Sequence, residues 1–214
     1  MRLKLLLGLI TLLFFISCEN SDQSTQTIDT HDFFHEIPAL SDNGLVNAVI
    51  EIPAGSNQKW EVEKDSGHLA WEVVEDTLRV VPYLPYPANY GMIPQTWLPI
   101  EEGGDDDPLD VIILGPASER GTVLEVRIVG VIKLLDHGEQ DDKLIAVDPN
   151  SWFGSVHTLE QLQVGFPGVV SILTEWFGSY KGEGLMEVEG VENENVADDI
   201  LQRSIEAYQR LYNN

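Results

Sequence analysis

Cysteine is nearly absent from this chain of 214 residues, and the single one, Cys18, cannot form an internal disulfide bond. Basic residues are scarce too: twelve lysines and arginines face 36 aspartates and glutamates, which gives a formal net charge of −24. A surface so acidic argues against binding to nucleic acid and against electrostatic binding to anionic lipid. No cysteine or histidine recurs at zinc-binding spacing. The histidines have no partner pattern and are interpreted as structural or surface residues: His31, His35, His68, His137 and His157.

One long apolar run, from Leu5 to Ile16, follows the basic residues Arg2 and Lys4. It is too short for a membrane-spanning helix and is typical of an export signal. Ser17 directly before Cys18 resembles a bacterial lipoprotein lipobox, in which cleavage leaves a lipidated cysteine at the new N-terminus. We therefore expect a lipoprotein signal peptide over residues 1–17; an ordinary signal with an incidental cysteine is the alternative.

Removal of that signal leaves ten basic residues against 36 acidic ones, a formal net charge of −26. Residues 18–32 are rich in Ser, Thr, Gln, Asn and Asp, which predicts a flexible tether. Residues 33–214 suit one domain. The expected protein is an exported bacterial lipoprotein that faces the periplasm or the cell surface and meets the membrane only through its N-terminal lipid.

Short β-strands dominate the predicted domain. The candidate strands are Val46–Ile52, Lys59–Glu63, Leu78–Val81, Val111–Leu114, Thr122–Leu135 and Leu144–Val147. Gly130 predicts a bulge or a corner inside the longest strand. Many short strands separated by turn signals favour a small closed barrel.

Two helices are expected near the C-terminus. The first begins with Pro167 in its first turn and ends near Lys181. Asn195 is the predicted N-cap of the second. Its predicted inward stripe consists of Val196, Ile200, Ser204, Ala207 and Leu211.

An acidic segment, Gly103 to Asp110, runs directly into the apolar strand that follows it. Asp105 and Asp107 are two positions apart, so an extended backbone would direct both side chains to one side. Pro108 turns the chain and lets Asp110 rejoin them. Carboxylates held this close stay ionised only when cations lie between them. An ordinary acidic surface loop is the alternative for this segment taken alone.

A second acidic group, Asp136 to Lys143, follows the longest strand. The available ligands are hard oxygen atoms, which favour magnesium, manganese or calcium. An EF-hand loop that starts at Asp105 fails, because Asp110 stands where the turn glycine belongs and Pro116 where the bidentate glutamate belongs.

The chemistry-bearing residues occur in a definite order: Glu51, Lys59-x-Glu61, Arg79, Tyr86-Pro-Ala-Asn-Tyr90-Gly91, Asp105-x-Asp107-Pro-x-Asp110, Asp136, Asp141-x-Lys143 and Tyr180-Lys181. This order resembles the family I soluble inorganic pyrophosphatases, with details closer to their eukaryotic branch. The resemblance implies a mainly β fold with flanking helices (α+β), built on a five-stranded OB-like closed barrel with the site at its mouth. It implies hydrolysis of pyrophosphate to two phosphates by a metal-activated water.

The resemblance also implies roles for single residues. The expected metal ligands are Glu51, Asp105, Asp110, Asp136 and Asp141, and Asp107 is expected to orient or deprotonate the attacking water. The expected phosphate-binding residues are Lys59, Arg79, Tyr90, Tyr180 and Lys181. Tyr86 is a secondary catalytic candidate near the leaving group, and Glu61 and Lys143 are supporting residues. The extra acids Asp106 and Asp142 are expected to strengthen the negative electrostatic field of the site and not to bind metal.

The implied cofactor is Mg²⁺, several ions per site, with Mn²⁺ or Zn²⁺ as substitutes and Ca²⁺ as an inhibitor. The implied partners are pyrophosphate and further copies of the chain in a homo-oligomer. The rival hypothesis is a non-catalytic, metal-binding surface lipoprotein that has kept the fold. Taken one at a time, these residues also have ordinary interpretations, such as turn tyrosines and a solvated strand lysine.

Overall fold

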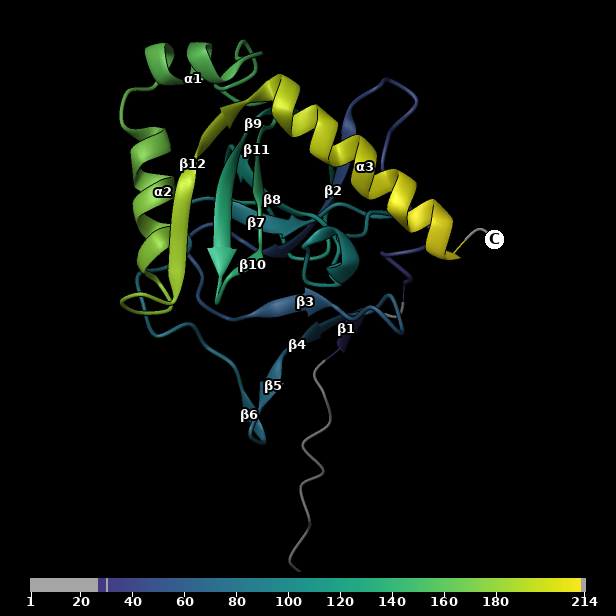
Figure 1. The fold of residues 1–214 in the computed structure, drawn as a ribbon. Helices are drawn as coiled ribbons and strands as arrows, with labels where there is room; N and C mark the ends of the chain where they lie inside the picture. Colours follow the sequence, from purple (N-terminus) through teal and green to yellow (C-terminus); the bar gives the residue numbers. More distant parts are fainter. Residues whose placement is uncertain (1–26, 30, 213–214) are drawn as a thin grey trace, which may run out of the picture.

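The computed structural model describes residues 27–29 and 31–212 (Figure 1). The predicted signal peptide and residues 18–26 and 30 of the predicted tether lie outside the described residues. Thr27–Asp29, predicted as part of the tether, forms a short paired strand. The elements are β1 (Thr27–Asp29), β2 (Val46–Ile52), β3 (Trp60–Val62), β4 (Leu69–Trp71), β5 (Val73–Val74), β6 (Thr77–Leu78), β7 (Asn89–Met92), the short 3-10 helix η1 (Ile100–Glu102), β8 (Asp110–Leu114), β9 (Val123–Asp136), β10 (Glu139–Gln140), β11 (Lys143–Val147), α1 (Leu159–Gly165), α2 (Val169–Ser179), β12 (Met186–Asn193) and α3 (Glu194–Tyr212).

Five strands close on themselves through their hydrogen bonds. The order is β9, β11, β8, β7 and β2, and β2 returns to β9. Only the β11–β8 pair in this ring is parallel, and it sets Lys143 opposite Asp110. β10 and β12 add to β9. The predicted mainly β fold with helices at its side is confirmed as this five-strand hydrogen-bonded ring.

Both faces of the ring strands are buried. In β8, Val111 and Ile113 join one apolar cluster, which includes Ile200 of α3. Ile112 joins the other, which includes Trp176 of α2. Burial on both faces explains why β8 is a continuous apolar run and does not alternate.

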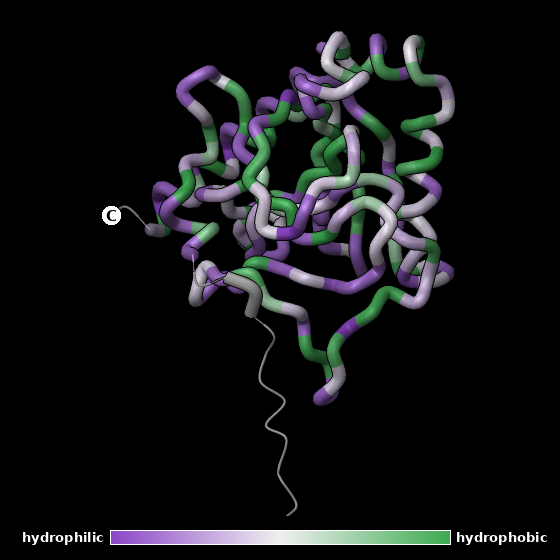
Figure 2. The backbone as a smooth tube through the Cα atoms, turned by 180° about the vertical axis from the view of Figure 1, so that it is seen from behind, coloured by the Kyte–Doolittle hydropathy of each residue, from purple (hydrophilic) through white to green (hydrophobic). Residues whose placement is uncertain are grey.

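The helices cover the ring from different sides. α3 packs against β9 and α2 packs against β12, and Figure 1 shows α1 and α2 beside β12 with α3 crossing the far end. In Figure 2 the hydrophobic stretches follow the strands in the middle of the molecule, and another lies on the projecting β5–β6 hairpin. Val73 and Val74 on that hairpin are each 46% exposed.

A small separate sheet of β1, β4 and β3 lies next to the ring, and its outer end continues into the β5–β6 hairpin (Figure 1). Trp60 and Val62 are buried while Glu61 between them is half-buried. The predicted alternation in this segment is therefore confirmed. It leaves Lys59 and Glu61 on a common side, with 3.5 Å between the lysine Nζ and the glutamate Oε2.

Several sequence predictions are confirmed closely. β2 has the predicted bounds, and β8, β9 and β11 match within a residue or two at each end. The bulge near Gly130 is real: Ile145 pairs with Gly130 but Ala146 pairs with Ile128, so Val129 is the extra residue. A Cβ at Gly130 would lie 2.9 Å from the Glu192 carbonyl oxygen, so the position also needs glycine for close packing.

Other predictions were wrong in detail. α2 starts at Val169 behind a left-handed Gly168, so Pro167 precedes the helix. Asn193, not Asn195, caps α3, because its Oδ1 accepts hydrogen bonds from the backbone N–H groups of Asn195 and Val196. Leu211, expected on the inward stripe, is 52% exposed.

Ile200, Ser204 and Ala207 of the predicted inward stripe are confirmed as buried, and Ala197, Leu201 and Tyr208 complete the inward face of α3. The predicted strand Leu78–Val81 is reduced to the end of β6 and one isolated bridge between Gln58 and Val80. Among the described helices, none is both long enough and apolar enough to cross a membrane.

Candidate active site

The acidic loop between η1 and β8 is a turn and not the predicted extended segment. Asp106 has a φ of 58°, and the Asp107 N–H donates to Asp105 Oδ1 at 3.1 Å. Asp106 faces the other way, since its Oδ1 accepts from the Ile100 N–H at 3.0 Å. The prediction of an extended segment was therefore wrong, although Asp105 and Asp107 still lie close enough to repel each other.

Parallel pairing of β8 with β11 brings the two acidic groups of the sequence together. Asp110 opens β8 and Lys143 opens β11 directly opposite. The buried Lys143 ammonium donates to both Asp110 Oδ2 and Asp141 Oδ1. Two carboxylates that lie 31 positions apart in the sequence thus share one lysine ammonium.

Asp136 closes β9 and is held by two basic groups. The Lys181 ammonium donates to Asp136 Oδ2, and His137 Nδ1 lies 2.7 Å from Asp136 Oδ1. Lys181 comes two residues after the end of α2, so this helix carries its cation to the end of β9. His137, interpreted from the sequence as a structural or surface residue, is exposed and pairs with Asp136.

A β-bulge directs Glu51 into the site. Ile50 pairs with Gly91 and Ile52 pairs with Tyr90, which leaves Glu51 as the extra residue of β2. The Glu51 carboxylate is buried and its Oε1 accepts from the Val62 N–H at 2.7 Å. Burial, partly opposed by the charge of Lys59, raises the pKa of Glu51 to about 8.

The basic side of the site comes from β3 and the base of the β5–β6 hairpin. The Lys59 N–H donates to the Arg79 carbonyl at 3.0 Å, which ties the two residues together. The Arg79 Nη1 atom lies 2.8 Å from each carboxylate oxygen of Glu72. Glu72 was not predicted as a site residue, and no sequence signal distinguishes it from other acids of this chain.

Three tyrosines fill the space between the acidic and the basic side. Tyr90 lies centrally, with Lys59 Nζ 5.8 Å and Lys143 Nζ 5.9 Å from its ring centroid. Tyr86 contacts Tyr90 at a centroid distance of 5.3 Å. Tyr180 is stacked on Trp176 of α2 at 4.8 Å. The predicted tyrosines are therefore part of one aromatic cluster that includes core residues.

A pocket of about 320 Å³ opens between the two sides. Its polar lining includes Glu51, Lys59, Glu61, Lys64, Asp107 and Asp110. Lys64 was missed by the sequence reasoning, although its Nζ lies only 2.6 Å from Asp107 Oδ1. The scarcity of basic residues could have identified it, since any lysine in so acidic a chain is unusual.

The donor set suits a hard divalent cation. Burial and the charges of Asp107, Asp141 and Asp110 raise the pKa of Asp105 to about 7. A cluster of carboxylate oxygens that repel one another is the environment that Mg²⁺ prefers. Within residues 27–29 and 31–212 no group of three or more acidic, histidine or cysteine side chains is arranged as a finished metal site. The Lys143 and Lys181 ammonium groups lie among the carboxylates instead.

Comparison with known proteins identifies the fold and the chemistry. The family model described as "Inorganic pyrophosphatase" matches residues 48–209. The inorganic pyrophosphatase of Kluyveromyces lactis is 34% identical over 203 residues, which cover 83% of this chain and 70% of that protein.

Solved structures agree with this match. The type I inorganic pyrophosphatase from P. falciparum has a TM-score of 0.77 and 26% identity over 84% of this chain and 63% of that one. The inorganic pyrophosphatase from Helicobacter pylori has a TM-score of 0.68 and 32% identity over 81% and 99%. The chain therefore belongs to the family I soluble inorganic pyrophosphatases, and it is an inorganic diphosphatase that hydrolyses pyrophosphate.

Proposed function

We propose that pyrophosphate is bound and cleaved in the pocket between the acidic loop and β3. The observation that carries this proposal is the lining of that pocket, to which Lys59, Asp107 and Asp110 all contribute. A phosphate-binding cation and two carboxylates thus face one space large enough for a small anion. The five-strand ring also supports the OB-like closed barrel that the resemblance implies, with this pocket at its mouth.

Divalent metal ions are used throughout this family, in general Mg²⁺. The residues that would hold them here are Glu51, Asp105, Asp110, Asp136 and Asp141. When bound, such ions attract pyrophosphate to an acidic protein and lower the pKa of water from 15.7 toward about 7. We propose several ions per site, with Mn²⁺ or Zn²⁺ as substitutes. The raised pKa of Asp105 supports this assignment, because burial and then the charges of the neighbouring carboxylates raise it, and a shared cation would offset both.

Each side chain of the site is assigned a separate role in the reaction. A carboxylate oxygen of Asp107 accepts a proton from the attacking water, whose oxygen forms a bond to one phosphorus as the bridging P–O bond breaks. The second phosphate leaves with the electron pair of that bond. Lys59 holds phosphate oxygens inside the pocket. Arg79, Tyr90, Tyr180 and Lys181 are outside the lining of the pocket and are assigned to the phosphate oxygens that extend beyond it. Tyr86 is assigned to the leaving phosphate, and Glu61 and Lys143 to support of the neighbouring charged groups.

A phosphate-release time course tests this proposal. Purified protein with excess Mg²⁺ is expected to release two phosphates for each pyrophosphate consumed, and EDTA is expected to stop the release. Binding of Mg²⁺ without phosphate release under either condition would favour the rival, a metal-binding lipoprotein without catalysis.

We also propose that the enzyme works outside the cytoplasm, anchored by lipid at Cys18. Support comes from Arg2 and Lys4, the apolar run behind them, and Ser17 before the cysteine. The residues between Cys18 and β1 would reach about 15 Å as a flexible coil, enough to lift a domain from lipid headgroups. Mass spectrometry of the mature N-terminus is expected to find an acylated Cys18. An unmodified Met1 would contradict the anchor without affecting the enzymatic assignment.

Two finer features stay proposals. The higher TM-score with the Plasmodium structure favours the eukaryotic branch, whereas the higher identity with the Helicobacter protein does not. A homo-oligomer is expected from the family resemblance, and light scattering of the purified protein gives its mass directly.

A further inference from the structure

Lys64, two residues beyond β3, contacts the acidic loop at two points. Its Nζ lies 2.6 Å from Asp107 Oδ1 and donates to the Asp106 carbonyl oxygen at 2.8 Å. The same Nζ lies 5.5 Å from the centroid of a Trp97 ring, within the range of a cation–π contact. Lys64 therefore joins the strand that carries Lys59 to the loop that carries Asp107.

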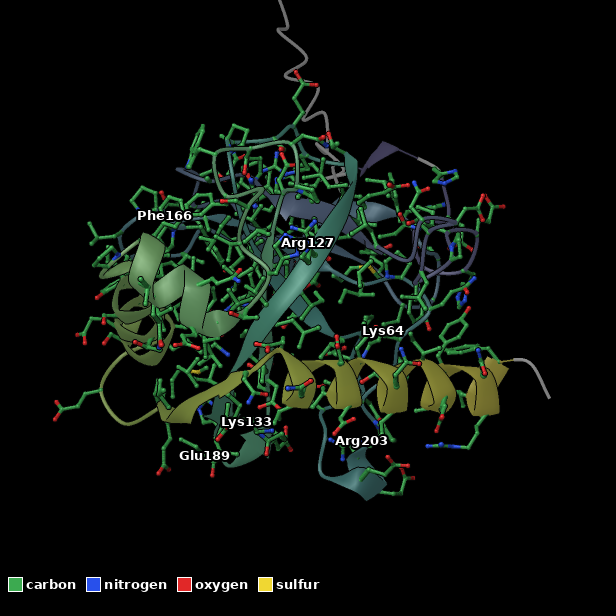
Figure 3. The ribbon with its side chains drawn as sticks, turned by 90° about the horizontal axis from the view of Figure 1, so that it is seen from above. Lys64, Arg127, Lys133, Phe166, Glu189 and Arg203 are labelled. Carbon is green, nitrogen blue, oxygen red and sulfur yellow. The ribbon has the colours of Figure 1, made fainter. Side chains whose placement is uncertain are left out.

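Two of these three contacts do not depend on the Asp107 carboxylate. The Asp106 carbonyl and the Trp97 ring would hold the ammonium at the edge of the loop whatever Asp107 does. These two contacts hold the Lys64 ammonium in place, so its ion pair with Asp107 can set the orientation of the Asp107 carboxylate. Figure 3 shows Lys64 well apart from Lys133, the lysine that pairs with the buried Asp142.

A purely stabilising role does not suit this pair. The side chains of Lys64 and Asp107 are 41% and 51% exposed, and ion pairs so open to solvent contribute little to folding stability. Direct binding of pyrophosphate suits Lys64 less well than Lys59. The Lys64 ammonium lies 2.6 Å from the Asp107 carboxylate and also donates to a loop carbonyl, whereas the Lys59 ammonium lies 3.5 Å from Glu61 Oε2.

We propose that Lys64 is a positioning residue for Asp107. It binds the Oδ1 atom and so leaves Oδ2 to face the attacking water. This inference rests on the proposed function, in which Asp107 accepts the proton of that water. Catalytic groups must be held in a near-attack geometry, and a displacement of about 1 Å can reduce turnover by about 100-fold.

The test compares steady-state hydrolysis of Mg²⁺-pyrophosphate by full-length wild type, Lys64→Met, Lys64→Arg and a control. The control is Arg210→Met, which removes a cation that pairs with Glu102 Oε1 at 2.6 Å just before the acidic loop. Lys64→Met is expected to lower kcat by about 10- to 100-fold while the KM stays near the wild-type value. Lys64→Arg is expected to recover most of the loss, and Arg210→Met to behave like wild type. Unfolding temperatures are expected to be alike for all four proteins.

A second variant set separates this inference from the function on which it rests. If Lys64 acts through Asp107, adding Lys64→Met to Asp107→Asn changes kcat by less than about threefold. An equal loss in both backgrounds, or a raised KM with unchanged kcat, would overturn the positioning role. If Asp107→Asn loses turnover and Lys64→Met does not, only the inference about Lys64 fails. If Asp107→Asn keeps full turnover, the assignment of Asp107 and the inference fail together.

Discussion

Arg79 is held at the base of the β5–β6 hairpin by both carboxylate oxygens of Glu72. A guanidinium has five donors in a planar fork, so it can keep this grip and still present N–H groups to a phosphate. A lysine ammonium is a point charge and cannot do both with the same geometry. The orientation of Arg79 is therefore as important as its charge.

We expect Arg79→Lys to raise the KM for pyrophosphate by about tenfold, the effect of losing one charge-assisted hydrogen bond of about 1.4 kcal/mol. Steady-state kinetics at saturating Mg²⁺ measures it. Arg203→Lys on the exposed side of α3 is the matched control, since within the described part of the chain its side chain bonds only the Asp199 carbonyl of its own helix. A wild-type KM in Arg79→Lys would show that Arg79 does not hold phosphate.

The sequence pattern identified most residues that the fold gathers here, because their order and their places at strand ends are visible in one dimension. It failed where burial decides. Asp142 looks like one more surface acid, yet it is 3% exposed and accepts from Gln140 Nε2 and the Leu134 N–H. Lys64 was missed for a different reason. The scarcity of lysine marks it, but the turn at Asp106 that brings it to Asp107 has no sequence signature.

At the scale of elements, β2 and β7 lie unusually close where Ile50 pairs with Gly91. A Cβ at Gly91 would lie 1.7 Å from the Val49 carbonyl oxygen, a distance that forces the strands apart. The neighbouring residues on these strands are Glu51 and Tyr90, so the packing of this pair also sets the shape of the site.

Gly91→Ala is therefore expected to destabilise the protein by about 3 kcal/mol, the upper part of the usual range for overpacking. Urea unfolding measures the change. Gly165→Ala at the end of α1 is the control, because no atom lies within 4 Å of its added Cβ, and it should be neutral or stabilising by at most about 1 kcal/mol. Equal stability of the two variants would contradict the close approach of β2 and β7.

Element prediction succeeded where the apolar pattern is continuous, as in β2 and β8, and failed where tertiary contacts select the conformation. β12 alternates from Met186 to Glu189, but a register shift between Val188 and Gly190 interrupts the pattern, so the sequence does not show that pairing with β9 continues to Asn193. α1 has seven residues, too few for a clear helical period. The N-cap of α3 lies two residues before the predicted one. The sequence offers two asparagines, and Asn193, at the end of β12, is the one that caps the helix.

For the whole molecule the dominant quantity is charge. The formal net charge of −24 opposes both the compact state and the approach of pyrophosphate. Divalent cations at the acidic edge relieve both effects, and ligands that bind only the folded state stabilise it.

Magnesium and calcium are therefore expected to raise the Tm of the protein alike, well above the effect of NaCl at equal ionic strength. Only magnesium is expected to support turnover, because calcium binds at longer distances with looser geometry and misplaces the reacting groups. Calcium added to the magnesium enzyme should inhibit it. Thermal unfolding and phosphate release on one sample measure both properties, and full activity in calcium alone would contradict the metal assignment.

The central claim is that Asp107 directs the attacking water while Asp110 and its neighbours hold metal. The direct test is a Mg²⁺ titration of pyrophosphate hydrolysis by wild type, Asp107→Asn and Asp110→Asn. Asp107→Asn is expected to keep the wild-type half-saturation by Mg²⁺ and to lose turnover by about 10² to 10⁴, the usual contribution of a general base. Asp110→Asn is expected to need more Mg²⁺. Identical titration curves for the two variants, or wild-type turnover in Asp107→Asn, would contradict the account.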